Sequence, residues 1–197
     1  MKISGEDVYL VEGSNYAVFQ MTYKEGGVNM CVEERILKKA VQEAIERFYL
    51  NDHYLIDSNV HERTITFRLG LYLQHIFISW DVDCECNKNI ETIKKNKLLS
   101  CRCKKGFECG NCTDCRSCTV FPDIIIHKRE TKNNLLVIEA KCNATPEKRE
   151  EDIDKLKAYL EERSLRYQYG LFIDFKPSLN ETLRGLYWLP KGKRSRG

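Results

Sequence analysis

The sequence predicts an α/β domain with a mixed central sheet flanked by helices, because the period of its apolar residues changes along the chain. Helical spacing, with apolar residues three or four positions apart, covers three segments: 32–50, 60–77 and 147–162. Short apolar or alternating runs, which are typical of strands, cover four others: 78–87, 121–128, 135–141 and 167–175. The resulting order of helices and strands is that of an α/β protein.

The first half of the chain supplies the expected helices. Strand-like composition occurs in 7–11 and 16–23, and Gly26 and Gly27 close this region. The first expected helix carries an apolar stripe: Ile36, Leu37, Ala40, Val41, Ala44, Ile45 and Phe48. A connector follows, and we expect Asn59 to be the N-cap of the second helix.

The expected strands differ in pattern. In 78–87 the side chains alternate, with Val82 and Cys84 directed one way and Asp83 and Glu85 the other. The segments 121–128 and 135–141 are almost continuously apolar, which predicts strands that are covered on both faces. The turn-like sequence RETKNN between them allows a hairpin.

Length and composition favour one domain over 1–197, with a cysteine-rich and lysine-rich insertion at 87–120 and a flexible basic tail at 190–197. With 42% hydrophobic and 31% charged residues, the chain is not expected to be disordered. No segment resembles a membrane helix or a signal peptide, so we expect a cytoplasmic protein without a membrane partner. A net charge of +3 does not by itself indicate a nucleic-acid partner.

Two carboxylates and a lysine are placed by the two apolar strands. Asp123 stands at the head of the first strand, whereas Glu139 and Lys141 share one face at the end of the second. If these strands are paired, Asp123 approaches Glu139, and two carboxylates with an open side are suitable ligands for Mg²⁺ or Mn²⁺. A lysine beside the ion can position water or neutralise a phosphate, which suits hydrolysis of a phosphodiester.

These motifs resemble those of the PD-(D/E)XK nuclease superfamily: Pro122-Asp123, a strand and a turn, then Glu139-Ala140-Lys141. The resemblance covers 32–176 and implies a restriction-endonuclease-like fold, with Asp123 and Glu139 as metal ligands and Lys141 as the catalytic lysine. It also implies an acidic residue on the first core helix, where Glu62 matches. Glu85 matches a further carboxylate of one branch, although Cys86 stands where that branch has tyrosine.

Six of the ten cysteines lie in the insertion: Cys101, Cys103, Cys109, Cys112, Cys115 and Cys118. Their clustering in a chain without an export signal predicts metal binding rather than disulfides. We expect a structural Zn²⁺ held by four thiolates. A [4Fe–4S] cluster is the alternative, because four of the cysteines follow one another at three-residue spacing.

The insertion bears several basic residues, among them Lys94, Lys95, Lys97, Arg102, Lys104, Lys105 and Arg116. Of these we expect Lys104, Lys105 and Arg116 to contact a phosphate backbone together with Lys155. The insertion can equally be a structural staple with a solubilising lysine coat. The predicted function is Mg²⁺-dependent hydrolysis of nucleic acid by a DNA endonuclease, which acts as a homodimer or with a targeting partner protein. The alternative is a non-catalytic nucleic-acid-binding or adaptor module on the same fold, with the zinc knob used for recognition.

Overall fold

The structure, a computed structural model, describes the side chains of residues 32–58, 60–85, 121–162 and 165–190. For short strands in the remainder it describes the backbone. These strands form two small antiparallel sheets. The first pairs β1 (Asp7–Tyr9), β2 (Phe19–Lys24) and β3 (Gly27–Cys31) in that order. The second pairs β5 (Lys97–Leu98) with β6 (Cys118–Thr119). The pair β5–β6 falls within the expected insertion.

A five-stranded mixed sheet forms the centre of the molecule, in the order β10-β9-β8-β7-β4. Its strands, in chain order, are β4 (Asp81–Cys84), β7 (Ile124–His127), β8 (Asn134–Cys142), β9 (Tyr169–Phe175) and β10 (Tyr187–Pro190). Strands β7 and β8 form the expected antiparallel hairpin pair, and β8 runs parallel to β9. The remaining neighbours, β4–β7 and β9–β10, are antiparallel.

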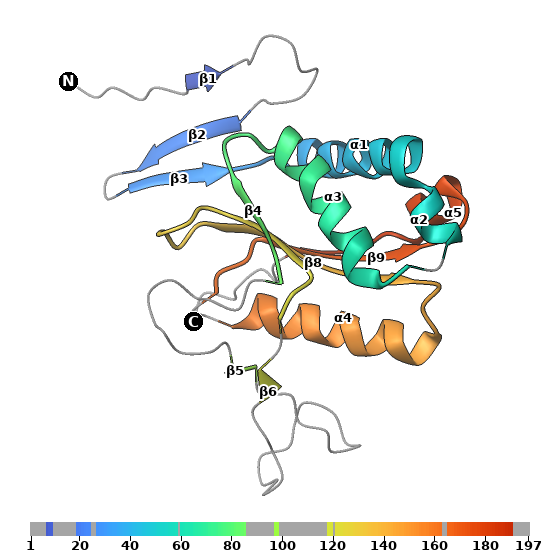
Figure 1. Cartoon of the computed structure of the whole chain (residues 1–197). Helices are drawn as coiled ribbons and strands as arrows, with labels where there is room; N and C mark the ends of the chain where they lie inside the picture. Colours follow the sequence, from blue (N-terminus) through green and yellow to red (C-terminus); the bar gives the residue numbers. More distant parts are fainter. Residues whose placement is uncertain are drawn as a thin grey trace, which may run out of the picture.

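Helices cover both faces of this sheet (Figure 1). Helices α1 (Glu34–Asp52) and α3 (Glu62–Ile76) lie on one face, and α4 (Pro146–Glu161) lies on the other. Two short helices, α2 (Tyr54–Asp57) and α5 (Leu179–Gly185), complete the described chain. The predicted α/β class, a mixed sheet between helical layers, is therefore confirmed. In the part of the chain that the structure describes, no helix is long and apolar enough to span a bilayer.

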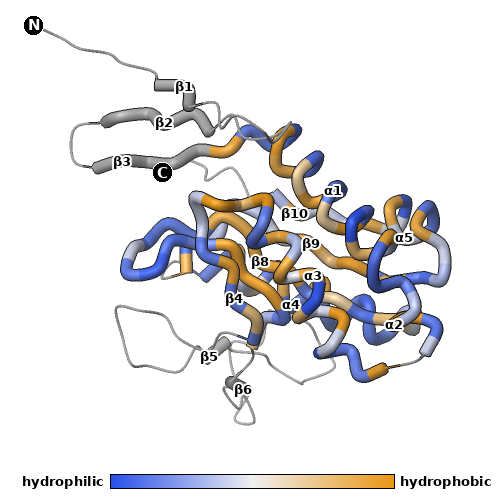
Figure 2. Tube along the Cα trace, turned by 45° about the horizontal axis from the view of Figure 1, so that its top comes forward, coloured by the Kyte–Doolittle hydropathy of each residue, from blue (hydrophilic) through white to orange (hydrophobic). Residues whose placement is uncertain are grey.

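Alternation of side chains along the central strands divides the apolar core into two. The core against α1 and α3 takes from these strands Ile124, Ile126, Leu136, Ile138, Ala140, Leu171, Ile173 and Phe175. The core against α4 takes Ile125, Val137 and Phe172. Figure 2 shows the central strands as mostly hydrophobic between helices of mixed character. The apolar runs thus belong to strands that are buried on both faces, as predicted.

The edge strand β4 is fastened to α3 by one side chain. Gln74 accepts a hydrogen bond from the Val82 amide at 3.0 Å and donates one to the Trp80 carbonyl at 2.9 Å. Unpaired backbone groups at a sheet edge tend to recruit other strands. Gln74 satisfies one such group, the Val82 amide, and also bonds the carbonyl of Trp80, the residue that precedes β4, so it connects α3 to the sheet edge.

Several boundaries differ from the sequence predictions. Helix α3 begins at Glu62 with His61 as its N-cap, and not at 60 after Asn59, because the Val60 amide bonds back to the Leu55 carbonyl at 3.4 Å. Strand β10 includes Pro190, where we expected the tail to begin, and residues 191–197 lie outside the described residues. Neither α5 nor β10 was predicted. The seven residues of α5 are too few to display a period.

The contact between α3 and β4 generates the first prediction. A Cβ atom on Gly70 would lie 2.7 Å from the Cys84 Sγ atom, closer than van der Waals contact allows. Overpacking costs about 1–3 kcal/mol, whereas alanine is favoured over glycine in a helix by about 1 kcal/mol. We expect Gly70→Ala to lower the free energy of unfolding in the wild-type chain and to raise it in a Cys84→Ala background. Urea denaturation of the four variants measures this reversal, and equal effects in both backgrounds would contradict it.

Candidate functional site

The candidate site lies where β8 continues beyond the end of β7. The pairing of the two strands ends at Ile124 opposite Ile138, so residues 139–142 of β8 pair only with β9. Beyond this point the Asp123 side chain replaces the backbone of β7 as the partner of β8: its Oδ2 atom accepts a hydrogen bond from the Ala140 amide at 2.8 Å. The sheet therefore opens beside Glu139, and Asp123 is fixed at the opening.

Glu139 and Lys141 project from β8 toward α4. Ala140, between them, packs in the opposite core with α1 and α3. Glu139 is only 2% exposed, and its Oε1 atom has no hydrogen-bond partner among the described residues. A buried carboxylate oxygen without a partner destabilises the folded state. This atom is therefore the clearest indication that the site binds a cation or a hydrogen-bond donor.

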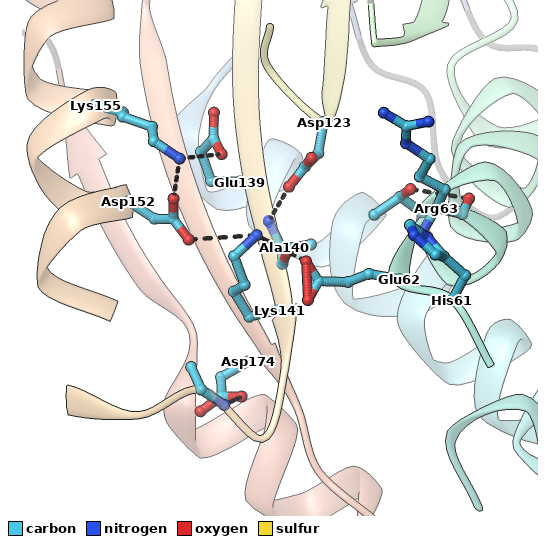
Figure 3. A network of polar contacts seen from close by, with 12 residues as sticks. His61, Glu62, Arg63, Asp123, Glu139, Ala140, Lys141, Asp152, Lys155 and Asp174 are labelled. Atoms are coloured by element: carbon cyan, nitrogen blue, oxygen red, sulfur yellow. Dashed lines mark hydrogen bonds and ion pairs between the residues drawn. The ribbon is translucent and has the colours of Figure 1, made fainter. Parts of the chain in front are cut away.

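Helix α4 contributes Asp152 and Lys155, which are three positions apart and face β8 (Figure 3). Asp152 is 1% exposed; its Oδ1 atom bonds Lys155 Nζ, and its Oδ2 atom lies 3.6 Å from Lys141 Nζ. Lys155 Nζ also lies 3.8 Å from the Glu139 Oε2 atom. The two lysines are thus joined through a single buried carboxylate.

Helix α3 contributes Glu62 from the other layer. Lys141 Nζ donates a hydrogen bond to the Glu62 Oε1 atom at 2.7 Å. Glu62 is the first residue of α3, where the helix dipole favours a negative charge. The short β7 leaves room for this contact around the edge of β8, and Figure 3 shows Glu62 and Asp152 on opposite sides of Lys141.

The electrostatics favour an added positive charge. Burial raises the pKa of Glu139 well above its usual range, and the neighbouring Asp123 charge raises it further, against the opposing effect of Lys155. Burial also raises the pKa of Asp123, although the Ala140 amide partly offsets this. Repulsion and desolvation therefore outweigh the attraction of the nearby ammonium groups.

Both lysines are held as cations. Burial alone would lower the pKa of Lys141, but the hydrogen bond to Glu62 and the charges of Asp123 and Asp152 raise it overall. The pKa of Lys155 is likewise raised, because the charges of Glu139 and Asp152 outweigh its burial. The cluster consists of four carboxylates and two ammonium groups: Glu62, Asp123, Glu139, Asp152, Lys141 and Lys155. When all six are ionised, its net charge is −2.

Glu85 is placed differently from the others. It follows β4 with a positive φ of 49°, so it leaves the alternation expected of a strand. Its Oε1 atom lies 2.5 Å from the Nε atom of Arg63 on α3, while its amide bonds the Asp123 carbonyl at 3.0 Å. The backbone of Glu85 thus supports Asp123, and its carboxylate is engaged by Arg63 at the rim of the site.

Sequence reasoning did not assign a role to Asp152. A usable signal existed: Asp152 occupies the same face of α4 as the buried Leu156 and Tyr159, at positions i, i+4 and i+7. A carboxylate on the apolar stripe of a helix needs a buried partner. The site therefore joins Asp152 to five of the predicted residues: Glu62, Asp123, Glu139, Lys141 and Lys155.

The donor set fits a small divalent cation. Mg²⁺ binds through one or two carboxylates and keeps several waters, and Asp123 and Glu139 offer two carboxylates with one orphaned buried oxygen. The described side chains do not form a ready-made cage of three or more acidic, histidine or cysteine ligands. The side chains of Cys101, Cys103, Cys109, Cys112, Cys115, Cys118, Lys104, Lys105 and Arg116 lie outside the described residues.

Comparison of the chain with protein-family models, with curated proteins and with solved structures finds no match. The functional argument therefore depends on the geometry and the charges of this cluster.

The charge imbalance leads to a second prediction, on stability. Glu139→Gln replaces a buried carboxylate with a neutral amide of almost the same volume. Because burial and the Asp123 charge raise the pKa of Glu139, its ionised form opposes folding at pH 7. We therefore expect the variant to be more stable than the wild type at pH 7 in the presence of a chelator, by about 1–3 kcal/mol. Guanidinium denaturation measures the difference. The matched control is Glu151→Gln on the exposed face of α4, with a change within about 0.5 kcal/mol. A loss of stability in Glu139→Gln would mean that the lysines already compensate this carboxylate.

Proposed function

We propose that the protein is a Mg²⁺-dependent nuclease that hydrolyses phosphodiester bonds, with DNA as its substrate and a restriction-endonuclease-like fold. The observation that supports this most directly is the orphaned oxygen of Glu139 beside Asp123 and Lys141. A binding module has no need of two buried carboxylates facing an anionic polymer, because they would repel it. They become useful when a cation lies between them and the phosphate.

Each residue has a distinct role in the proposed reaction. Asp123 and Glu139 hold the ion, which supplies Lewis-acid polarisation of the phosphate and charge stabilisation on the leaving oxygen. Asp123 uses one oxygen to hold the Ala140 amide, which fixes its position for the ion. Glu62 orients Lys141 Nζ through their 2.7 Å hydrogen bond.

Lys141 acts as a cation in this proposal. Its raised pKa keeps the ammonium protonated at neutral pH, so in the free protein it is a hydrogen-bond donor and not a base. As a donor it can position the attacking water or hold a phosphate oxygen, and it offsets charge that accumulates on the phosphorus oxygens. The proton of the water must then leave by another route, through the solvent or a phosphate oxygen.

Substitution of the three central residues tests the activity. We expect Asp123→Asn, Glu139→Gln and Lys141→Ala each to lower Mg²⁺-dependent cleavage by at least about 100-fold without unfolding the chain. Lys141→Ala should still bind the ion in calorimetry. Cleavage is measured on plasmid DNA, single-stranded DNA and RNA, with circular dichroism as the check of folding.

A matched control is available on α4. Lys157 pairs with Asp154 at 2.8 Å on the exposed face of the helix, so Lys157→Ala should cleave as the wild type does. Full activity in Asp123→Asn or Glu139→Gln would refute the proposed ion site. Binding of nucleic acid without cleavage, in the wild type with Mg²⁺, would favour the adaptor module instead.

We further propose that the cysteine-rich insertion binds Zn²⁺ through four of its six cysteines. A polar insertion of this kind has few large apolar residues and cannot form a core of its own, whereas zinc binding to small peptides contributes on the order of 10 kcal/mol. Elemental analysis of the purified protein should find zinc, and Cys109→Ser with Cys112→Ser should make the insertion sensitive to protease. Iron with acid-labile sulfide would identify a [4Fe–4S] cluster instead, and neither metal together with a protease-resistant insertion would refute metal binding.

A further inference from the structure

Lys155 occupies an unusual position for a helix lysine. Its ammonium group lies between two almost fully buried carboxylates: it bonds Asp152 Oδ1 and lies 3.8 Å from Glu139 Oε2. The side chain itself is 35% exposed, so the ammonium group reaches inward from the surface of α4. This ammonium is the positive charge that the described structure places between the two carboxylates (Figure 3).

The position of Nζ matters because Glu139 has two oxygens with different surroundings. Oε2 is near Lys155, while Oε1 is buried without a partner among the described residues. If the proposed ion binds at Oε1 with Asp123, then Lys155 Nζ stands on the other side of the same carboxylate. In sites with two metals, the ions lie about 3.5–4 Å apart and share carboxylates in this way.

Asp152 completes the resemblance to a second cation site. Its carboxylate is 1% exposed, comes from a different element than Glu139, and has an Oδ2 atom without a hydrogen-bond partner among the described residues. Glu139 and Asp152 would therefore be suitable ligands for a second ion. An ammonium group is already bound there, and a divalent ion at the same place would be strongly repelled by it.

We propose that Lys155 takes the place of a second metal ion, so that the site binds a single divalent cation, and that Asp152 is the positioning residue that holds Lys155 and Lys141. This inference depends on the proposed function, because it assumes the first ion at Asp123 and Glu139. Asp152 connects the two ammonium groups: its Oδ1 atom bonds Lys155 Nζ, and its Oδ2 atom lies 3.6 Å from Lys141 Nζ.

The test counts bound ions instead of measuring cleavage. Mn²⁺ is titrated into the full chain without nucleic acid, and electron paramagnetic resonance of the free ion gives the number bound. The variants are Lys155→Met, which keeps the length of the side chain and removes its charge, and Lys155→Arg, which keeps the charge. Lys157→Met is the matched control, because Lys157 lies on the same helix and pairs only with Asp154 among the ion pairs described.

We expect the wild type, Lys155→Arg and Lys157→Met to bind one Mn²⁺ per chain at this site, and Lys155→Met to bind two. The double variant Lys155→Met with Asp152→Asn should return to one, because the second ion loses a ligand. All variants have the same cysteines, so any Mn²⁺ bound in the insertion adds equally to each count. Lys155→Gln replaces Lys155→Met if circular dichroism shows that the latter does not fold.

The outcomes separate this inference from the proposed function. A wild-type count that Glu139→Gln lowers by two ions, or a folded Lys155→Met or Lys155→Gln chain that binds no more ions than the wild type, would refute the role of Lys155 and leave the first ion site intact. A wild-type count that Glu139→Gln does not lower would instead refute the ion site itself, and with it the proposed function. The double variant isolates Asp152, since a count equal to that of Lys155→Met would show that Asp152 is not a ligand of the second ion.

Discussion

The register of β7 on β8 is the constraint on which the site depends. Ile124 opposite Ile138, and Ile126 opposite Leu136, direct four apolar side chains into the core against α1 and α3. Glu139 and Lys141 consequently face α4, and Asp123 lies directly beyond the last pair. A slip of one residue would turn Glu139 and Lys141 to the other face and bury Ala140 against α4. The apolar pattern that stabilises the sheet therefore also sets the spacing of the charges.

The two helical layers both reach Lys141, through Glu62 of α3 and Asp152 of α4. Helix α4 is fixed by Leu156 and Tyr159 in the second core, and Asp152, one turn earlier, is carried down to β8. Helix α3 is held against the edge strand by Gln74. Its first residue, Glu62, accepts a hydrogen bond from Lys141, the lysine that Asp152 contacts from α4. Contacts made away from the site thus set the distances between its charged side chains. The apolar contacts also offset the repulsion between carboxylates that would otherwise separate these elements.

Prediction from the sequence succeeded where one element carried its own signal. The strand pair was recognisable from its apolar runs and turn, and the two-residue spacing of Glu139 and Lys141 placed both on one face before any tertiary contact was known. Contacts between distant segments could not be predicted in this way. The partner of Glu85 depends on a positive φ that ends the alternation of β4. The start of α3 depends on a backbone bond from Val60 to Leu55. Asp152 was recognisable as a carboxylate on the apolar stripe of α4, but one of its two partners, Lys141, comes from β8 and could not be predicted from the sequence of α4 alone.

The arrangement of charges also explains why the site contains two lysines in addition to the metal ion proposed at Asp123 and Glu139. A site with four ionised carboxylates and no ammonium group would need two divalent ions for neutrality, and both would have to be present to hold the phosphate. With Lys141 and Lys155 built into the fold, the remaining two negative charges match one divalent ion. Lys155 is bound to Asp152 before any ligand arrives, so this part of the charge is preorganised and needs no diffusing ion. On the proposed function, the chain therefore depends on one exchangeable cation, and the position of that cation is set by the oxygen of Glu139 that neither lysine satisfies.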